Sequence, residues 1–173
     1  LYVLEQPETP PAVNAMLPSV HNTPWPLSPS YTLPTAPSAD VTRILIVEDN
    51  PWVQQVLAGL LLKLNCQTCL AADGQEALQR LASEVFDLVL MDCDLPGLDG
   101  FSTTQLWRSQ TLQTAGAASA PQVPIIAVTA HISASHRQQA REAGMNDFLQ
   151  KPIDMRTLHD VLTRWLPQYA SKA

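Results

Sequence analysis

Residues 41–166 repeat one pattern five times: a short apolar run is followed by a longer stretch with apolar residues at helical spacing. The runs are too short for helices and carry few polar residues, which is typical of parallel strands buried on both faces. We expect strands over residues 43–47, 66–71, 86–91, 124–128 and 146–150. Strands that alternate with helices form a parallel sheet covered on both sides. The sequence therefore predicts an α/β fold, a doubly wound five-stranded parallel sheet.

Residue types at the expected helix ends support this division. Asn50, Asp73, Ser133 and Asp154 each precede a helical pattern, and their side chains favour the N-cap position. Gly144 closes the fourth helical pattern, since glycine readily adopts the left-handed conformation that stops a helix. The helices are thus delimited by local chemistry as well as by periodicity.

Residues 1–40 have a different composition, with nine of the fifteen prolines and no Gly, Lys or Arg. Proline fixes φ and removes a hydrogen-bond donor, so we expect a semi-rigid, partly extended linker. Residues 1–6 begin with the apolar run Leu-Tyr-Val-Leu. They are either the last strand of a truncated upstream kinase ATP-binding domain or an apolar, disordered chain end. We place the folded domain at residues 41–168 and a tail at residues 169–173.

Charge and cysteine content exclude several classes of partner. Ten Lys and Arg stand against sixteen Asp and Glu, a net charge of −6, which argues against binding a nucleic-acid backbone. An apolar run of seven residues, Val56–Leu62, is too short to span a bilayer, so we expect no membrane contact by this segment. Three cysteines, an odd number, do not form a disulfide framework and favour a reducing cytoplasm.

Polar residues follow four of the five predicted strands. Glu48 and Asp49 follow the first, Asp92 the third, Thr129 the fourth and Lys151 the fifth. The carboxyl ends of parallel strands meet at one edge of the sheet, where such folds bind ligands. Carboxylates packed closely repel one another unless a cation joins them. A hard divalent ion such as Mg²⁺ (or Mn²⁺) suits this set and retains waters for a phosphoryl ligand.

Several known catalytic motifs are missing from the sequence. It contains neither G-x-x-x-x-G-K-[ST] nor G-x-G-x-x-G, the loops that hold nucleotide phosphates. The cation would therefore assist transfer of a phosphoryl group activated elsewhere. Asp92 is the expected acceptor, because a carboxylate nucleophile can form an aspartyl phosphate.

Four segments in this order resemble the receiver domains of two-component phosphorelays in general. They are Ile-Leu-Ile-Val-Glu-Asp-Asn at 44–50, Met-Asp-Cys-Asp-Leu-Pro-Gly-Leu-Asp-Gly at 91–100, Val-Thr-Ala at 128–130 and Phe-Leu-Gln-Lys-Pro at 148–152. The receiver domains of hybrid sensor histidine kinases are resembled most by Glu-Asp-Asn at 48–50, Asp-Gly-Phe at 99–101 and Gly-Met-Asn-Asp at 144–147. The resemblance implies a flavodoxin-like (βα)₅ fold with strand order 2-1-3-4-5. It also implies a phosphoprotein that takes a phosphoryl group from phosphohistidine and relays the signal or switches on it.

The resemblance assigns metal ligands and an acceptor. Asp92 attacks the phosphorus, and Asp49 and Asp92 hold Mg²⁺ directly. Glu48 acts largely through water, and the backbone carbonyl of Asp94 completes the protein ligands. Phosphoryl transfer depends mainly on positioning and charge neutralisation, which is consistent with this set.

The resemblance also assigns residues that bind the phosphoryl group or move in response to it. Lys151 pairs with its oxygens, Thr129 hydrogen-bonds to one of them, and Phe148 turns inward when Thr129 moves. The implied partners are a histidine kinase, a histidine phosphotransfer domain or both, docked beside the first helix. The bond between Lys151 and Pro152 is expected to be cis.

Asp94 and His131 depart from the common pattern at the rim of the site. We hypothesise that they tune the lifetime of the aspartyl phosphate by steering water, the alternative being that both are solvated rim residues. The segment 111–122 is longer than the family needs and is expected to be a flexible loop. Cys66 and Cys69, three residues apart on a strand, should face opposite sides of the sheet.

Two other classes of function remain open. Asp92-Cys93-Asp94 also matches the Asp-x-Asp of haloacid-dehalogenase-like phosphatases, although that motif usually ends the first strand of their sheet. A receiver-like interaction module that is never phosphorylated is the second alternative. Turnover of a phosphomonoester would support the first, and failure of every phosphoryl donor would support the second.

Overall fold

The computed structural model describes residues 41–114, 123–131 and 133–170. The predicted linker, residues 1–40, and residues 115–122 of the predicted loop lie outside the described residues. Eleven elements follow one another in these parts of the chain: β1 Arg43–Val47, α1 Pro51–Lys63, β2 Gln67–Ala71, α2 Gly74–Ser83, β3 Leu88–Asp92, α3 Gly100–Thr114, β4 Ile125–Thr129, α4 Ala134–Ala143, β5 Asp147–Gln150, α5 Met155–Trp165 and α6 Pro167–Ala170.

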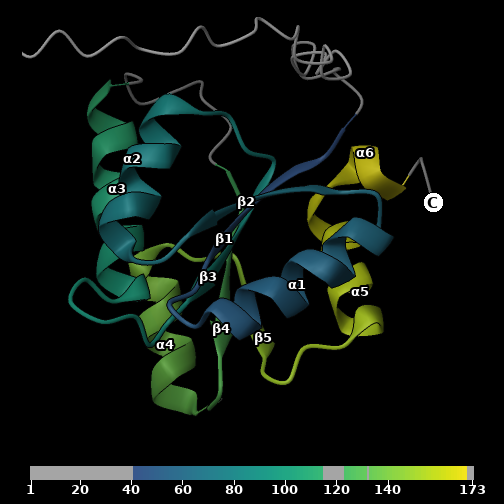
Figure 1. Cartoon of the computed structure of the whole chain (residues 1–173). Helices are drawn as coiled ribbons and strands as arrows, with labels where there is room; N and C mark the ends of the chain where they lie inside the picture. The colour runs from purple at the N-terminus through teal and green to yellow at the C-terminus, as the bar shows by residue number, and fades with distance from the viewer. Residues whose placement is uncertain (1–40, 115–122, 132, 171–173) are drawn as a thin grey trace, which may run out of the picture. The chain divides into compact units, whose positions relative to one another are not determined.

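The five strands form one parallel sheet in the order β2-β1-β3-β4-β5, which confirms the predicted fold class. Helices α1 and α5 cover one face, and α2, α3 and α4 cover the other (Figure 1). Every connection from one strand to the next passes through a helix, so the carboxyl ends of all strands lie at the same edge. That edge carries the loops after β1, β3, β4 and β5.

The alternation of side chains along β1 divides the core into two layers. Ile44 and Ile46 pack with residues of α1 and α5, whereas Leu45 and Val47 pack with residues of α2 and α4. Successive side chains of a strand point to opposite faces, so a strand covered on both sides must be apolar throughout. This explains the uninterrupted apolar sequence of β1.

All four predicted N-caps are confirmed. Side-chain oxygens of Asn50, Asp73, Ser133 and Asp154 accept hydrogen bonds from backbone N–H groups in the first turns of α1, α2, α4 and α5, at 2.8–3.1 Å. Gly144 ends α4 with φ +86°, in the left-handed region, as predicted. Each cap satisfies a backbone donor or acceptor that the helix end would otherwise leave unpaired.

The third helix is longer than predicted. α3 continues to Thr114, so the expectation of a loop is wrong for residues 111–114. The Thr111 hydroxyl donates to the carbonyl of Trp107 at 2.9 Å, and no helix-breaking Gly or Pro lies between Gly100 and Gly116. Helix α6 also runs two residues beyond the predicted domain end, with Tyr169 buried against the α1–α5 layer of the core.

The cysteines lie as the strand period predicts. Cys66 precedes β2 and is buried in the α1–α5 layer, whereas Cys69 packs against the opposite layer. The two thiols therefore do not form a shared metal or redox site. Among the described residues, no helix combines the length and apolar character that crossing a membrane requires.

Candidate functional site

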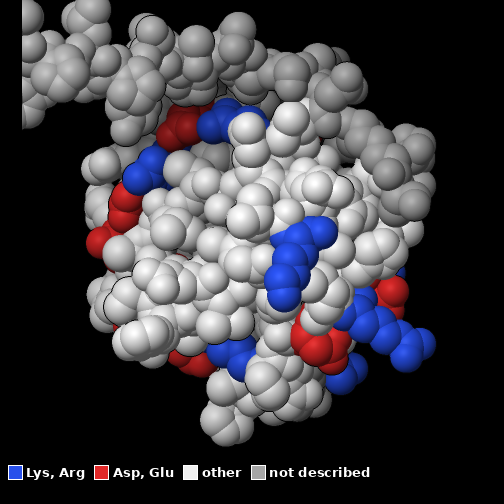
Figure 2. Space-filling view, turned by 45° about the vertical axis from the view of Figure 1, so that its right-hand side comes forward, with Lys and Arg blue, Asp and Glu red and all other residues white. Residues whose placement is uncertain are grey.

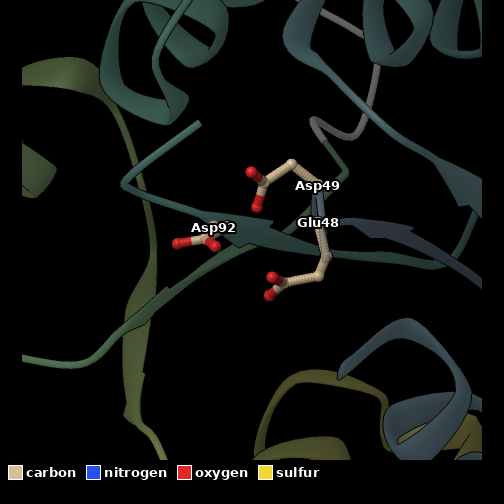
Figure 3. A group of neighbouring side chains, drawn as sticks. All are labelled: Glu48, Asp49 and Asp92. Carbon is tan, nitrogen blue, oxygen red and sulfur yellow. The ribbon is translucent and has the colours of Figure 1, made fainter. Parts of the chain in front are cut away.

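Three carboxylates converge at the carboxyl edge of the sheet. Glu48 and Asp49 leave the end of β1, and Asp92 is the last residue of the adjacent strand β3 (Figure 3). One oxygen from each lies within 4.8 Å of the others. Glu48 and Asp92 are 2% and 3% exposed, and Asp49 faces solvent. The site thus has two buried carboxylates and one that remains accessible.

Lys151 supplies the positive charge that faces this group. Its Nζ donates to Glu48 Oε2 and to Asp92 Oδ2, both at 2.7 Å. Burial alone would lower the pKa of the Lys151 ammonium, but its hydrogen bonds to Asp92 and Glu48 outweigh burial and raise that pKa. Burial raises the pKa of Glu48, and the charge of Asp92 adds to the effect. One ammonium beside three carboxylates leaves excess negative charge at the edge.

The loop after β5 places Lys151 over the sheet edge. Its backbone N–H donates to the carbonyl of Thr129, the last residue of β4, at 2.8 Å. The peptide bond between Lys151 and Pro152 is cis, as predicted. The ammonium therefore reaches the carboxylates from the far side of β3, opposite β1.

The loop after β3 is held close to Asp92. The backbone N–H of Asp94 donates to Asp92 Oδ1 at 3.0 Å, while the Asp94 side chain is exposed. A Cβ on Gly100 would collide with the carbonyl oxygen of Asp92. Glycine at the start of α3 therefore lets the backbone pass close to the carbonyl of Asp92, and this keeps the loop with Asp94 beside the site.

Thr129 lies at the same edge, but its hydroxyl is turned toward its own loop. It donates to the carbonyl of His131 and accepts from the N–H of His131, both at 3.1 Å. Thr129 is buried, and the His131 side chain is exposed. The structure therefore places Thr129 beside the site and His131 on its rim.

Phe148 lies beside Thr129 on the neighbouring strand β5. Its half-buried ring is covered by the guanidinium of Arg137, with the guanidinium carbon 4.7 Å from the ring centroid. Phe148 and Thr129 line the same small cavity of about 10 Å³, together with Cys93 and Ala127. Both side chains therefore border the same cavity next to the sheet edge.

One feature of the site, Gln54, was missed by sequence reasoning, whereas Trp52, close to Asp49, was expected either to pack over the edge of the site or to be exposed. Gln54, in the first turns of α1, donates from Nε2 to the carbonyl oxygen of Glu48 at 2.6 Å. Trp52, 78% exposed, borders an open groove of about 470 Å³ with Val56, Pro152 and Lys151. The available signal for Gln54 was a glutamine that interrupts the apolar pattern of the helix.

Comparison with known families identifies this arrangement. The family model of the response regulator receiver domain matches residues 44–163, which is most of the chain. The chain belongs to this family. Its resemblance to receivers is thereby confirmed.

Curated relatives of the receiver domain include hybrid kinases. It is 39% identical over 130 residues to hybrid signal transduction histidine kinase A of Dictyostelium discoideum, covering 75% of this chain and 6% of that protein. It is 35% identical over 124 residues to the histidine-protein kinase BarA of Escherichia coli K12, covering 72% and 13% respectively. The chain thus spans only a small part of the relatives that it matches.

Solved structures of receivers share its fold. The receiver domain of sensor histidine kinase PA1611 from Pseudomonas aeruginosa PAO1, solved with a magnesium ion in its active-site cleft, is 38% identical with a TM-score of 0.63. That match covers 73% of this chain and 98% of the other. The Saccharomyces cerevisiae complex of the phosphotransfer protein Ypd1 with the Ssk1 receiver matches at 32% identity and a TM-score of 0.67, covering 73% and 89%.

Proposed function

We propose that the receiver domain takes a phosphoryl group from a phosphohistidine onto Asp92, with Mg²⁺ bound, and passes on or switches with that group. The observation that carries the proposal is the convergence of Glu48, Asp49, Asp92 and Lys151 at one sheet edge. The four residues lie at or just after the ends of three strands, β1, β3 and β5, and family membership fits the same chemistry.

In the transfer step, a carboxylate oxygen of Asp92 forms a bond to phosphorus while the bond between phosphorus and the histidine nitrogen breaks. The electron pair of that bond stays on the imidazole, which returns to its neutral form by taking a proton from solvent. Lys151, already at 2.7 Å from Asp92, pairs with the phosphoryl oxygens as their charge develops. The product is an aspartyl phosphate that water later hydrolyses.

The carboxylate cluster fits a hard divalent cation, Mg²⁺ or Mn²⁺. The donor set is oxygen alone, and its excess negative charge is what such a cation would compensate. Asp49 and Asp92 would bind directly, Glu48 through water, and Asp94 through its backbone carbonyl. When bound, the cation neutralises phosphoryl charge. The magnesium ion reported for the PA1611 receiver supports this assignment.

Phosphorylation would be read out through Thr129 and Phe148. The Thr129 hydroxyl must leave the His131 backbone to reach a phosphoryl oxygen. That movement enlarges the small cavity that Thr129 and Phe148 share, and Phe148 can then turn inward. The result is a shift in the populations of the conformations that the surface formed by α4, β5 and α5 can adopt.

A histidine kinase or histidine phosphotransfer domain is the proposed partner, docked beside α1. The groove between Trp52, Val56 and Pro152 opens next to Lys151, so a protein seated there would reach the site. Figure 2 brings the α1 and α5 side forward, and the centre of this surface is mostly uncharged. The complex of Ypd1 with the Ssk1 receiver supports a phosphotransfer partner.

The wider setting that we propose is the cytoplasmic part of a hybrid sensor histidine kinase. In it, residues 1–40 would form the linker before a receiver domain that begins at residue 41 and extends through α6 to residue 170. Similarity to hybrid signal transduction histidine kinase A of Dictyostelium discoideum supports this setting. We also propose that Asp94 and His131, both exposed on the rim, tune the lifetime of the aspartyl phosphate.

Intact-protein mass after incubation with Mg²⁺ and a small acyl phosphate tests the core of the proposal. We expect a single phosphoryl adduct in the wild type, and none in Asp92→Asn or with a chelator. If no adduct forms, a phosphorylated histidine phosphotransfer protein is supplied as donor. Transfer from that donor alone still supports the proposal, whereas failure with both donors identifies a non-phosphorylated interaction module.

A further inference from the structure

We infer that Gln54 is a positioning residue for the carboxylate pair, acting on the peptide that joins Glu48 to Asp49; this inference rests on the proposed function. The Gln54 side chain folds back from the first turns of α1 toward the end of β1. Its Nε2 donates to the carbonyl oxygen of Glu48 at 2.6 Å and lies 3.4 Å from that of Ala71.

The position of Glu48 explains why its carbonyl oxygen needs a hydrogen bond from a side chain. Val47 is the last residue of β1 that pairs with β2 and β3, so Glu48 lies just past the strand ladder. Its N–H still donates to the carbonyl of Ala71 at 3.1 Å. Its carbonyl oxygen has left the ladder, and the amide of Gln54 takes the place of a neighbouring strand.

The consequence reaches Asp49 through covalent geometry. The carbonyl of Glu48 and the nitrogen and Cα of Asp49 lie in one rigid peptide plane. Holding the carbonyl oxygen therefore fixes the plane that carries the nitrogen and Cα of Asp49, and rotation about the bonds beyond this plane is all that remains to direct the Asp49 carboxylate. The Glu48 carboxylate is fixed independently by Lys151 at 2.7 Å, but Asp49 is exposed and depends more on its backbone.

The test is Mg²⁺ binding by isothermal titration calorimetry, compared between wild type, Gln54→Met and Gln55→Met. Methionine keeps the length of glutamine and its helix propensity but cannot donate. The exposed neighbour Gln55 is the matched control. We expect Mg²⁺ affinity to fall roughly tenfold in Gln54→Met, as removal of a hydrogen bond that orients a metal ligand does, and to be unchanged in Gln55→Met.

A double variant separates positioning from general damage to the fold. If Gln54 acts through Asp49, Gln54→Met should cost no further Mg²⁺ affinity in an Asp49→Asn background. The phosphorylation rate of the single variant Gln54→Met should also recover at saturating Mg²⁺. Wild-type affinity in Gln54→Met, or an equal loss in both backgrounds, would overturn the inference. A wild type that binds no Mg²⁺ would instead overturn the proposed function.

Discussion

The two edges of the sheet use acidic side chains in opposite ways. At the carboxyl edge, Glu48, Asp49 and Asp92 lie within 4.8 Å of one another and face the single ammonium of Lys151. At the amino edge, acceptor side chains instead sit against backbone N–H groups and cations. The first arrangement concentrates like charges, and the second pairs each acceptor with donors.

Strand starts illustrate the second arrangement. Asp87 accepts from the N–H of Arg43 at 2.7 Å, and Asn146 accepts from the N–H of Ile125 at 2.9 Å. These N–H groups begin β1 and β4, where the strand ladder does not yet pair them. Asn146 also accepts from the buried Arg108 guanidinium at 2.9 Å, which ties α3 to the start of β5.

Asp147 is the most fully paired carboxylate of the amino edge. It accepts from Arg164 at 2.7 Å, from the Trp165 indole at 2.9 Å and from the N–H of Phe148 at 2.9 Å. These contacts fasten the last turn of α5 to β5. The comparison teaches that acceptors at the amino edge are matched by donors, while the carboxyl edge retains electrostatic repulsion that a cation can relieve.

Removing the Lys151 ammonium from the carboxyl edge should have the largest effect on stability. Lys151→Met leaves the buried carboxylates Glu48 and Asp92 facing each other without compensation. We expect a loss of about 2–3 kcal/mol in unfolding free energy in the absence of Mg²⁺, less than a fully buried pair would show because Lys151 is partly exposed. Urea unfolding with a chelator measures it, and Lys63→Met on exposed α1 is the control.

Addition of Mg²⁺ distinguishes the cause of that loss. A bound cation should restore part of the stability of Lys151→Met, because it compensates the same carboxylates. An equal loss with and without Mg²⁺ would show that Lys151 contributes packing instead of charge.

Asp147→Ala probes the amino edge and should have a smaller effect. We expect it to lower the unfolding free energy by about 2 kcal/mol, because it removes several hydrogen bonds, one of them from the Trp165 indole. The loss should be the same with and without Mg²⁺, since no carboxylate of the metal cluster is touched. Thermal unfolding measures it, with Asp160→Ala at an exposed position as control. A Mg²⁺-dependent loss would contradict the separation of the two edges.

Asp49→Asn should change stability in the opposite direction. Removing one of three repelling charges should raise the unfolding free energy by about 1 kcal/mol without Mg²⁺. The same variant should lose most of the extra stability that the wild type gains from Mg²⁺. Denaturation curves at several Mg²⁺ concentrations test both statements, and Asp160→Asn controls for the substitution. A destabilised Asp49→Asn would mean that repulsion does not dominate at this edge.

The convergence of these groups was predictable because topology alone brings it about. Once the strands are parallel, Glu48, Asp92 and Lys151 must meet at one edge, whatever the details of packing. The caps at Asn50 and Asp154 were likewise local, since each side chain bonds to a residue two or three positions ahead.

Other features depend on contacts that sequence periodicity does not encode. Gln54 returns to a carbonyl six residues earlier, at an angle set by how α1 packs on the sheet. The Thr129 hydroxyl has local acceptors at His131, so residue type alone did not show where it points. The length of α3 depended on hydrogen bonds such as that of the Thr111 hydroxyl, and no helix-breaking residue stops the helix at this point.

The smallest stability effect is expected at the exposed rim of the carboxyl edge. Asp94→Asn and His131→Ala should each change the unfolding free energy by less than about 0.5 kcal/mol, because both side chains are exposed. Their effect should instead fall on hydrolysis of the aspartyl phosphate, if the pair steers water toward phosphorus. Loss of the phosphoryl adduct is followed by intact mass after removal of the donor, beside wild type and Asp160→Asn. Hydrolysis rates equal to wild type in both variants would make the pair solvated rim residues, and the charges that govern the site would then be those of the carboxylate cluster and Lys151 alone.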